Sequence, residues 1–160
     1  MALNYRIENN PQGDTVHFTG KINEDAELTF ADLAKNKVAN HCTFNLKEIE
    51  MINSCGVRAW INFLRLIEKG REIVLAECTP EIVSQINMIP HFKGTAKVQS
   101  LYASYICEDC DTHKLEMFTQ GVNMPLSPDQ KLPEVICPNC KKPMEMEELE
   151  DEFFAWVSGA

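Results

Sequence analysis

Four of the seven cysteines occur in two identical spacings that suit a metal ion. Cys107 and Cys110 enclose two residues, as do Cys137 and Cys140, and 26 residues separate the two pairs. A two-residue spacer lets one tight turn point both sulfur atoms at the same place. Two such turns supply the four thiolates that tetrahedral Zn²⁺ prefers. We therefore predict one structural Zn²⁺ bound by these four side chains, with no open coordination position for catalysis.

Two alternatives exist for these spacings. Either pair alone could be a redox-active dithiol, but two pairs within one short segment favour the metal site. His113 could replace one cysteine as a ligand, although we expect a solvent-exposed hairpin residue at that position. The other three cysteines are isolated, and for Cys42 and Cys78 we expect small buried side chains.

The cysteine count and the N-terminal residues indicate a cytoplasmic protein. Seven is an odd number, which suits a reducing compartment better than a set of disulfides. Residues 1–14 lack the basic segment and apolar run of a secretory signal. No stretch approaches the roughly 18 consecutive apolar residues of a membrane span, so none is expected.

The negative charge is concentrated in the last third of the chain. The formal net charge is −9, from 15 basic and 24 acidic residues. Residues 1–106 hold 11 basic and 12 acidic residues, whereas residues 107–160 hold 4 and 12, a net charge of −8. This change predicts two domains, 1–104 and 105–160. Because a charge of −8 repels phosphates, the predicted zinc ribbon is expected to contact protein and not nucleic acid.

Hydrophobic patterns over the first hundred residues predict a mixed α/β domain. Strands are expected at 5–9, 15–19, 42–46, 73–76 and 98–106, and helices at about 30–38, 54–69 and 79–89. Asn23 or Asp25 is expected to cap the first helix. Gly70 is expected to end the second, and Pro80 to open the third. The order β-β-α-β-α-β-α-β implies right-handed crossovers within one mixed sheet.

The predicted helix over 54–69 carries a wide apolar arc beside one narrow polar stripe. This arc exceeds what one sheet face needs. Either the third helix covers the remainder, or it faces a partner protein or a second copy of the chain, which would make a homodimer.

The residues after the second cysteine pair predict a short strand and a short helix. Alternating methionines and glutamates over 144–147 indicate an edge strand. One apolar face of a C-terminal helix is expected, at helical spacing, from Leu149, Phe153, Trp156 and Val157. We expect this face to dock on the first domain; a patch for a partner protein is the alternative.

Three short motifs give the first domain a resemblance to a known family. They are Phe-Thr-Gly-Lys-Ile-Asn at 18–23, Asn-Leu at 45–46 followed by Ile-Asn-Ser-Cys-Gly-Val at 52–57, and Cys-Thr-Pro at 78–80. In this order and spacing, residues 5–104 resemble the STAS family, named for sulfate transporters and anti-sigma factor antagonists. The resemblance implies a STAS-like mixed β-sheet with helices. It also implies a non-enzymatic bacterial regulator that binds partner proteins.

The same resemblance implies a phosphorylation site. In the anti-sigma factor antagonist branch, a serine of the second motif accepts phosphate from a partner kinase, and the phosphate breaks the complex. The matching residue is Ser54, within a partner surface of Asn53, Cys55, Gly56 and Arg58. A helix N-terminus stabilises a phosphate, which adds about −1.5 to −2 charge there. The alternative is that Ser54 only caps the helix.

The chain departs from this motif at three of these positions. Asn53 stands where the family has an aspartate, Cys55 where it has a second serine or threonine, and Arg58 where it has a small residue. These departures alter the charge and bulk of the partner surface that the resemblance implies.

The leading hypothesis is a cytoplasmic regulatory module for protein–protein interaction, a signalling phosphoprotein controlled at Ser54. Its partner would be a kinase-type anti-sigma factor or another complex subunit. The first alternative is a scaffold subunit of a multiprotein complex without phospho-switching. The second is a nucleic-acid accessory protein, which the charge opposes. An enzyme is not expected, because no Ser-His-Asp set, carboxylate pair or P-loop is recognisable.

Overall fold

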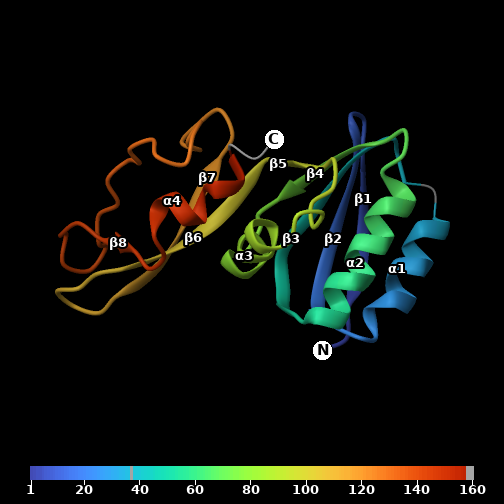
Figure 1. The fold of residues 1–160 in the computed structure, drawn as a ribbon, viewed down its shortest axis with the longest axis horizontal. Coiled ribbons are helices and arrows are strands. Elements are labelled where there is room, and N and C mark those ends of the chain that lie inside the picture. The colour runs from blue at the N-terminus through green and yellow to red at the C-terminus, as the bar shows by residue number, and fades with distance from the viewer. Residues whose placement is uncertain (37, 158–160) are drawn as a thin grey trace.

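The computed structural model describes residues 1–36 and 38–157, which form two β-sheets side by side (Figure 1). The first sheet has the order β1-β2-β3-β4-β5. Its strands are β1 Asn4–Asn10, β2 Gly13–Ile22, β3 His41–Ile52, β4 Glu72–Ala76 and β5 Lys97–Val98. The β1–β2 pair is antiparallel and the other pairs are parallel, so the sheet is mixed. The end of the predicted second domain, residues 158–160, lies outside the described residues.

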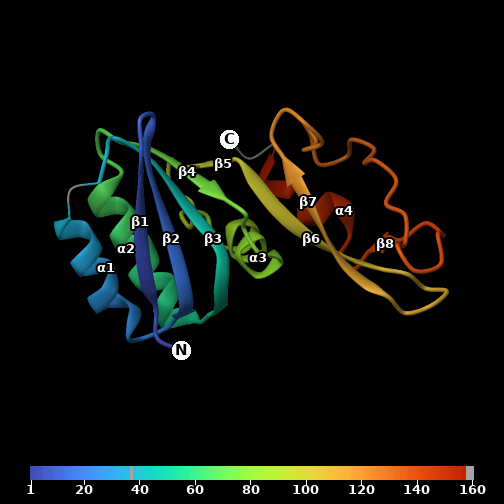
Figure 2. The same cartoon turned by 180° about the vertical axis from the view of Figure 1, so that it is seen from behind.

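Three helices accompany the first sheet. They are α1 Ala26–Lys35, α2 Ser54–Ile67 and α3 Pro80–Met88. Helices α1 and α2 cover one face, and Figure 2 shows them behind the strands when the sheet is seen from its other side. Asp25 occupies the N-cap position of α1 but makes no side-chain cap, whereas Thr79 caps α3 with Pro80 next to it. Among the described residues, no helix has the length and apolar character needed to cross a bilayer.

Aromatic side chains fill the core between the first sheet and its helices. Neighbouring ring centroids lie 4.8–6.3 Å apart within a cluster of Phe18, Phe30, Phe44, Trp60, Phe63 and Phe92. The indole N–H of Trp60 donates to the Phe92 carbonyl at 2.8 Å. Helix α1 and the segment around Phe92 therefore cover part of the apolar arc of α2, while Leu66 remains 69% exposed.

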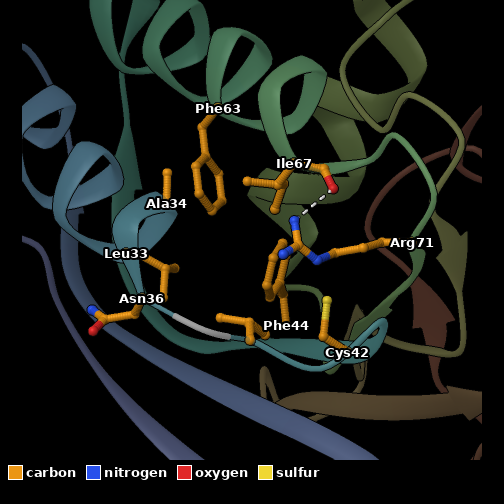
Figure 3. A pocket seen from close by; sticks show the side chains of 9 residues that line it. Leu33, Ala34, Asn36, Cys42, Phe44, Phe63, Ile67 and Arg71 are labelled. Atoms are coloured by element: carbon orange, nitrogen blue, oxygen red, sulfur yellow. Dashed lines mark hydrogen bonds between the residues drawn. The ribbon is translucent and has the colours of Figure 1, made fainter.

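One end of this core leaves a small cavity beside Arg71 (Figure 3). Its volume of about 10 Å³ is close to the space of one water molecule. Arg71 donates to the Ile67 carbonyl at 3.1 Å, and Cys42 lies in the wall of the cavity.

Cys42 and Cys78 are both fully buried, as expected. Burial raises the pKa of the Cys42 thiol to about 11, so this side chain remains protonated near neutral pH.

The strand predicted over 98–106 is divided between the two sheets, so the expectation of one sheet was wrong. Strand β6, Ser100–Ile106, lies between β7 His113–Thr119 and β8 Glu145–Met146 in a separate antiparallel sheet. Gln99 joins the sheets: its N–H donates to Leu75 at 2.8 Å, and its carbonyl accepts from Gln120 at 2.8 Å. The alternating burial of β6 would suit a strand of either sheet. Its antiparallel pairing with β7 places it in the second sheet. The predicted domain boundary after residue 104 falls within β6.

The C-terminal segment forms two short helices where one was predicted. These are α4 Glu150–Phe153 and the 3₁₀ helix η1 Ala155–Val157. Phe153 and Phe154 are both buried, although consecutive residues of a straight helix point about 100° apart. The side chain of Asn87 in α3 donates to the Phe153 carbonyl at 2.9 Å and accepts from the backbone N–H of Trp156 at 3.0 Å. The segment therefore docks on α3, but Leu149, expected on the buried face, is 65% exposed.

Candidate functional site

The four cysteines of the two C-x-x-C pairs come together at the far end of the second sheet. Their Sγ atoms all lie within 4.8 Å of one another. Cys107 lies 3.4 Å from Cys140, and Cys110 lies 3.6 Å from Cys137, measured between sulfur atoms. None of the four forms a disulfide. The sequence spacing therefore identified a real cluster.

Two turns of the same geometry position these sulfur atoms. In the first, Cys107 N–H donates to Thr112 and Asp111 N–H donates to Cys107, at 2.9 and 2.8 Å. In the second, the Cys137 N–H donates to the Lys142 carbonyl at 2.8 Å, and the Lys141 N–H donates to the Cys137 carbonyl at 3.0 Å. Asp111 and Lys141 both adopt positive φ, 58° and 65°. Each turn therefore curls its backbone around its two cysteines.

The cluster could bind one metal ion. Four sulfur atoms at about 2.3 Å from a tetrahedral Zn²⁺ lie about 3.8 Å from one another, close to the observed separations. Hydrogen bonds from the Thr112 and Asn139 side chains lower the pKa of Cys110 to about 6. His113 does not join the cluster: its Nδ1 lies 2.7 Å from a Glu147 carboxylate oxygen.

The second candidate site lies at the N-terminus of α2, where two sequence motifs meet. The N–H of Asn53 donates to the carbonyl of Ile22 at the end of β2, at 3.1 Å. The side chain of Asn53 accepts from the N–H of Gly56 at 2.9 Å. Asn53 is therefore the N-cap. The alternative that Ser54 caps the helix was wrong, because Ser54 is the first helical residue.

Gly56 explains why the motif has a glycine at this position. A Cβ atom on Gly56 would lie 1.8 Å from the Ile22 carbonyl oxygen and 2.9 Å from the Asn23 nitrogen. Both are backbone atoms that cannot move aside independently. Glycine therefore allows α2 to start directly against the end of β2.

This close approach leaves an exposed polar surface around Ser54. Ser54, Cys55 and Arg58 are exposed, whereas Gly56 is buried beneath them. The first N–H groups of α2 have no acceptor within the helix, and its dipole is positive there. Ser54 is thus an accessible hydroxyl at a position suited to a negative group.

Glu24 belongs to the same surface, although the sequence did not single it out. The Asn53 amide donates to the Glu24 carboxylate at 3.1 Å. Hydrogen bonds from its own backbone N–H and from Asn53 lower the pKa of Glu24. A carboxylate is therefore present next to Asn53. Its only sequence signal is its position directly after the first motif.

A second polar group that sequence reasoning missed lies between the sheets. Glu77 follows β4 with a φ of +51°. Its carboxylate accepts from Asn45 of β3 at 2.6 Å and from the Tyr102 hydroxyl of β6 at 2.5 Å. The hydrogen bond from Tyr102 lowers the pKa of Glu77, while burial and Glu77 raise the pKa of Tyr102 to about 12. Glu77 therefore links the two sheets as an ionised carboxylate near neutral pH.

Comparisons with known proteins leave the family of the chain open. No family model and no curated protein matches the sequence. Among solved structures, the chain is similar to the anti-sigma factor antagonist SpoIIAA in its unphosphorylated form, with 11% sequence identity and a TM-score of 0.42. The match covers 60% of this chain and 87% of that chain. Similarity this low does not establish membership of a family.

Proposed function

We propose that the chain is a non-enzymatic, cytoplasmic regulatory module of bacterial signalling that binds partner proteins and is switched by phosphorylation of Ser54. The observation that carries the proposal is the exposed Ser54 hydroxyl in the first turn of α2, which Asn53 leaves free by capping the helix. The motif resemblance supplies the role of this serine, and residues 1–104 would form the regulatory domain.

The partner surface would consist of Glu24, Asn53, Ser54, Cys55 and Arg58 over the buried Gly56. A partner kinase would transfer the terminal phosphoryl group of ATP to Ser54 Oγ and release ADP. The phosphate would add about −1.5 to −2 charge beside Glu24. The local net charge, which Arg58 and Glu24 together keep near zero, would then become negative. A partner that fits the neutral surface would then dissociate.

We further propose that the four-cysteine cluster holds one structural Zn²⁺ in an acidic zinc-ribbon domain over residues 105–160. The bound ion would neutralise part of the thiolate charge and fix the two turns in place. All four ligands come from the chain, so the ion would contribute to stability and not to catalysis.

The switch is tested by recovering a tagged chain from its native host. The expected partner has a kinase-type ATPase fold, and phosphate is expected on the peptide that contains Ser54. Ser54→Asp is expected to reduce partner recovery at least tenfold, while the uncharged, size-matched control Ser54→Asn retains most of it. Equal recovery with both variants, together with no phosphate on Ser54, would contradict the switch and favour the scaffold subunit without phospho-switching.

A further inference from the structure

A groove of about 670 Å³ lies on the second sheet, away from Ser54. One wall is the irregular segment 128–135, and the other is β8 with residues 148–151. Tyr105, Val135 and Met144 form an apolar floor and are 4–6% exposed. Figure 1 shows β8 and α4 on the side of the molecule remote from α1 and α2. The groove is therefore separate from the proposed phosphorylation surface.

Negative charge lines both walls. The acidic residues of the groove are Asp129, Glu134, Glu145, Glu148, Glu150 and Asp151, and all are exposed. Lys131 is the single basic residue among those that line it. Residues 107–160 as a whole carry a net charge of −8, so the surrounding surface adds to the negative potential. A cationic ligand is favoured here and a phosphate backbone is repelled.

Tyr105 supplies a second observation at the groove. The residue is only 4% exposed and lines the floor, and its hydroxyl makes no hydrogen bond to any residue that the structure describes. The hydroxyl is not among the buried polar atoms that lack a partner, so it reaches solvent at the floor. It is therefore available to a group that enters the groove.

We propose that this groove binds an extended basic segment of a partner protein. Lysine or arginine side chains of the segment would meet the acidic walls, and intervening apolar side chains would rest on Val135 and Met144. The Tyr105 hydroxyl would pair with the backbone of the segment. Strand β8 lies at the edge of its sheet, a position that suits an extended ligand. The proposal does not depend on phosphorylation of Ser54.

The first test uses the whole 160-residue chain, purified with zinc, and fluorescein-labelled nonapeptides measured by fluorescence anisotropy. The probe alternates Lys with Val and Leu; one control replaces every Lys by Glu, and the other replaces every Val and Leu by Ser. The Lys/apolar peptide is expected to bind and to weaken at least tenfold between 50 and 300 mM NaCl, because salt screens exposed charges. The Glu peptide should not bind, and the Ser peptide should bind at least tenfold more weakly.

The second test locates the site. Glu134→Gln with Glu148→Gln neutralises one carboxylate on each wall and is expected to weaken the Lys/apolar peptide about tenfold. The matched control, Glu27→Gln with Glu50→Gln, removes the same charge from the first domain and should leave binding unchanged. Tyr105→Phe should weaken binding about threefold. Zinc content and thermal melting of each variant confirm that the fold is intact.

Two outcomes would overturn the groove. Equal weakening by the two double variants would show that only net charge attracts the peptide. Equal affinity for the Ser peptide would show that the apolar floor has no part in binding. Ser54→Asp should leave peptide binding unchanged, so failure of the phosphorylation switch and failure of the groove are distinguishable.

Discussion

Two adjacent residues at the start of α2 have different roles: one caps the helix and the other remains exposed to solvent. Asn53 satisfies the N–H of Gly56, and Ser54 remains exposed. This division was not predictable, because Asn and Ser are both strong N-cap residues and their order alone does not say which adopts the extended conformation. The contact between Asn53 and Ile22 decides it.

This division predicts different effects of two alanine substitutions on stability. Asn53→Ala is expected to lower the free energy of unfolding by about 1 kcal/mol, because the helix loses its cap. Ser54→Ala should change it by less than about 0.5 kcal/mol, as is usual for exposed positions. Urea unfolding followed by circular dichroism measures both. A larger loss for Ser54→Ala than for Asn53→Ala would show that the serine is the true cap.

Gly56 gives a second prediction at the same scale. Gly56→Ala places a methyl group against the Ile22 carbonyl and is expected to lower the free energy of unfolding by about 3 kcal/mol. Gly70→Ala is the control: its Cβ would meet no atom within 4 Å, so only its positive φ of 75° is penalised, by about 1 kcal/mol. Equal midpoints in urea would mean that α2 can move away from β2.

At the scale of elements, local sequence patterns predicted pieces better than their pairing. The strands predicted at 15–19 and 42–46 lie within β2 and β3, which both extend further, and the predicted Thr-Pro start of α3 is observed. The division of strand 98–106 was missed because alternating burial does not specify which sheet a strand joins. The break at Phe154 was missed because its cause, the Asn87 side chain, lies 66 residues before Phe153.

The Glu77 link between the sheets predicts a pH dependence of stability. The native pKa of Glu77 is lowered, so its ionised form contributes stability above about pH 4.5, and this contribution disappears as the pH falls through the native pKa. Glu77→Gln should lose about 1 kcal/mol at pH 7 relative to wild type. The difference should shrink toward pH 3.

Urea unfolding at pH 7, 5 and 3 tests this dependence. The control is Glu48→Gln, whose carboxylate is exposed on β3 and lies at no helix terminus. It should match wild type throughout. A Glu77→Gln defect that is independent of pH would mean that the carboxylate charge does not stabilise the link.

For the whole molecule, the two tryptophans report on different regions. Trp60 lies in the first core, and Trp156 lies in η1, docked on α3. In Trp156→Phe, emission therefore reports the first core alone. Zinc removal by a chelator is expected to unfold the cysteine turns, because structural zinc contributes folding energy directly. The Trp60 emission maximum should shift little, since its aromatic neighbours all belong to the first domain.

Metal analysis should find one zinc per chain before chelation and none afterwards. Cys110→Ser should lose the ion and reproduce the chelated spectrum. A zinc-free preparation with unchanged circular dichroism would contradict a structural metal.

The four-cysteine cluster was predictable from the sequence because two short turns with identical spacing constrain the positions of their own sulfur atoms. The groove was not predictable, since its walls come from segments that only the tertiary fold brings together.

The hydrogen bonds of Gln99 to both sheets have a consequence for how the protein could act on its partners. A chain with a loose tether between two binding surfaces tolerates partners of many shapes. Here β5 passes into β6 through one residue that is anchored on both sides, and Glu77 adds a further tie. These hydrogen bonds hold the Ser54 surface and the acidic groove at a fixed distance and orientation. An assembly that occupies both surfaces must therefore present its two contacts at the same distance.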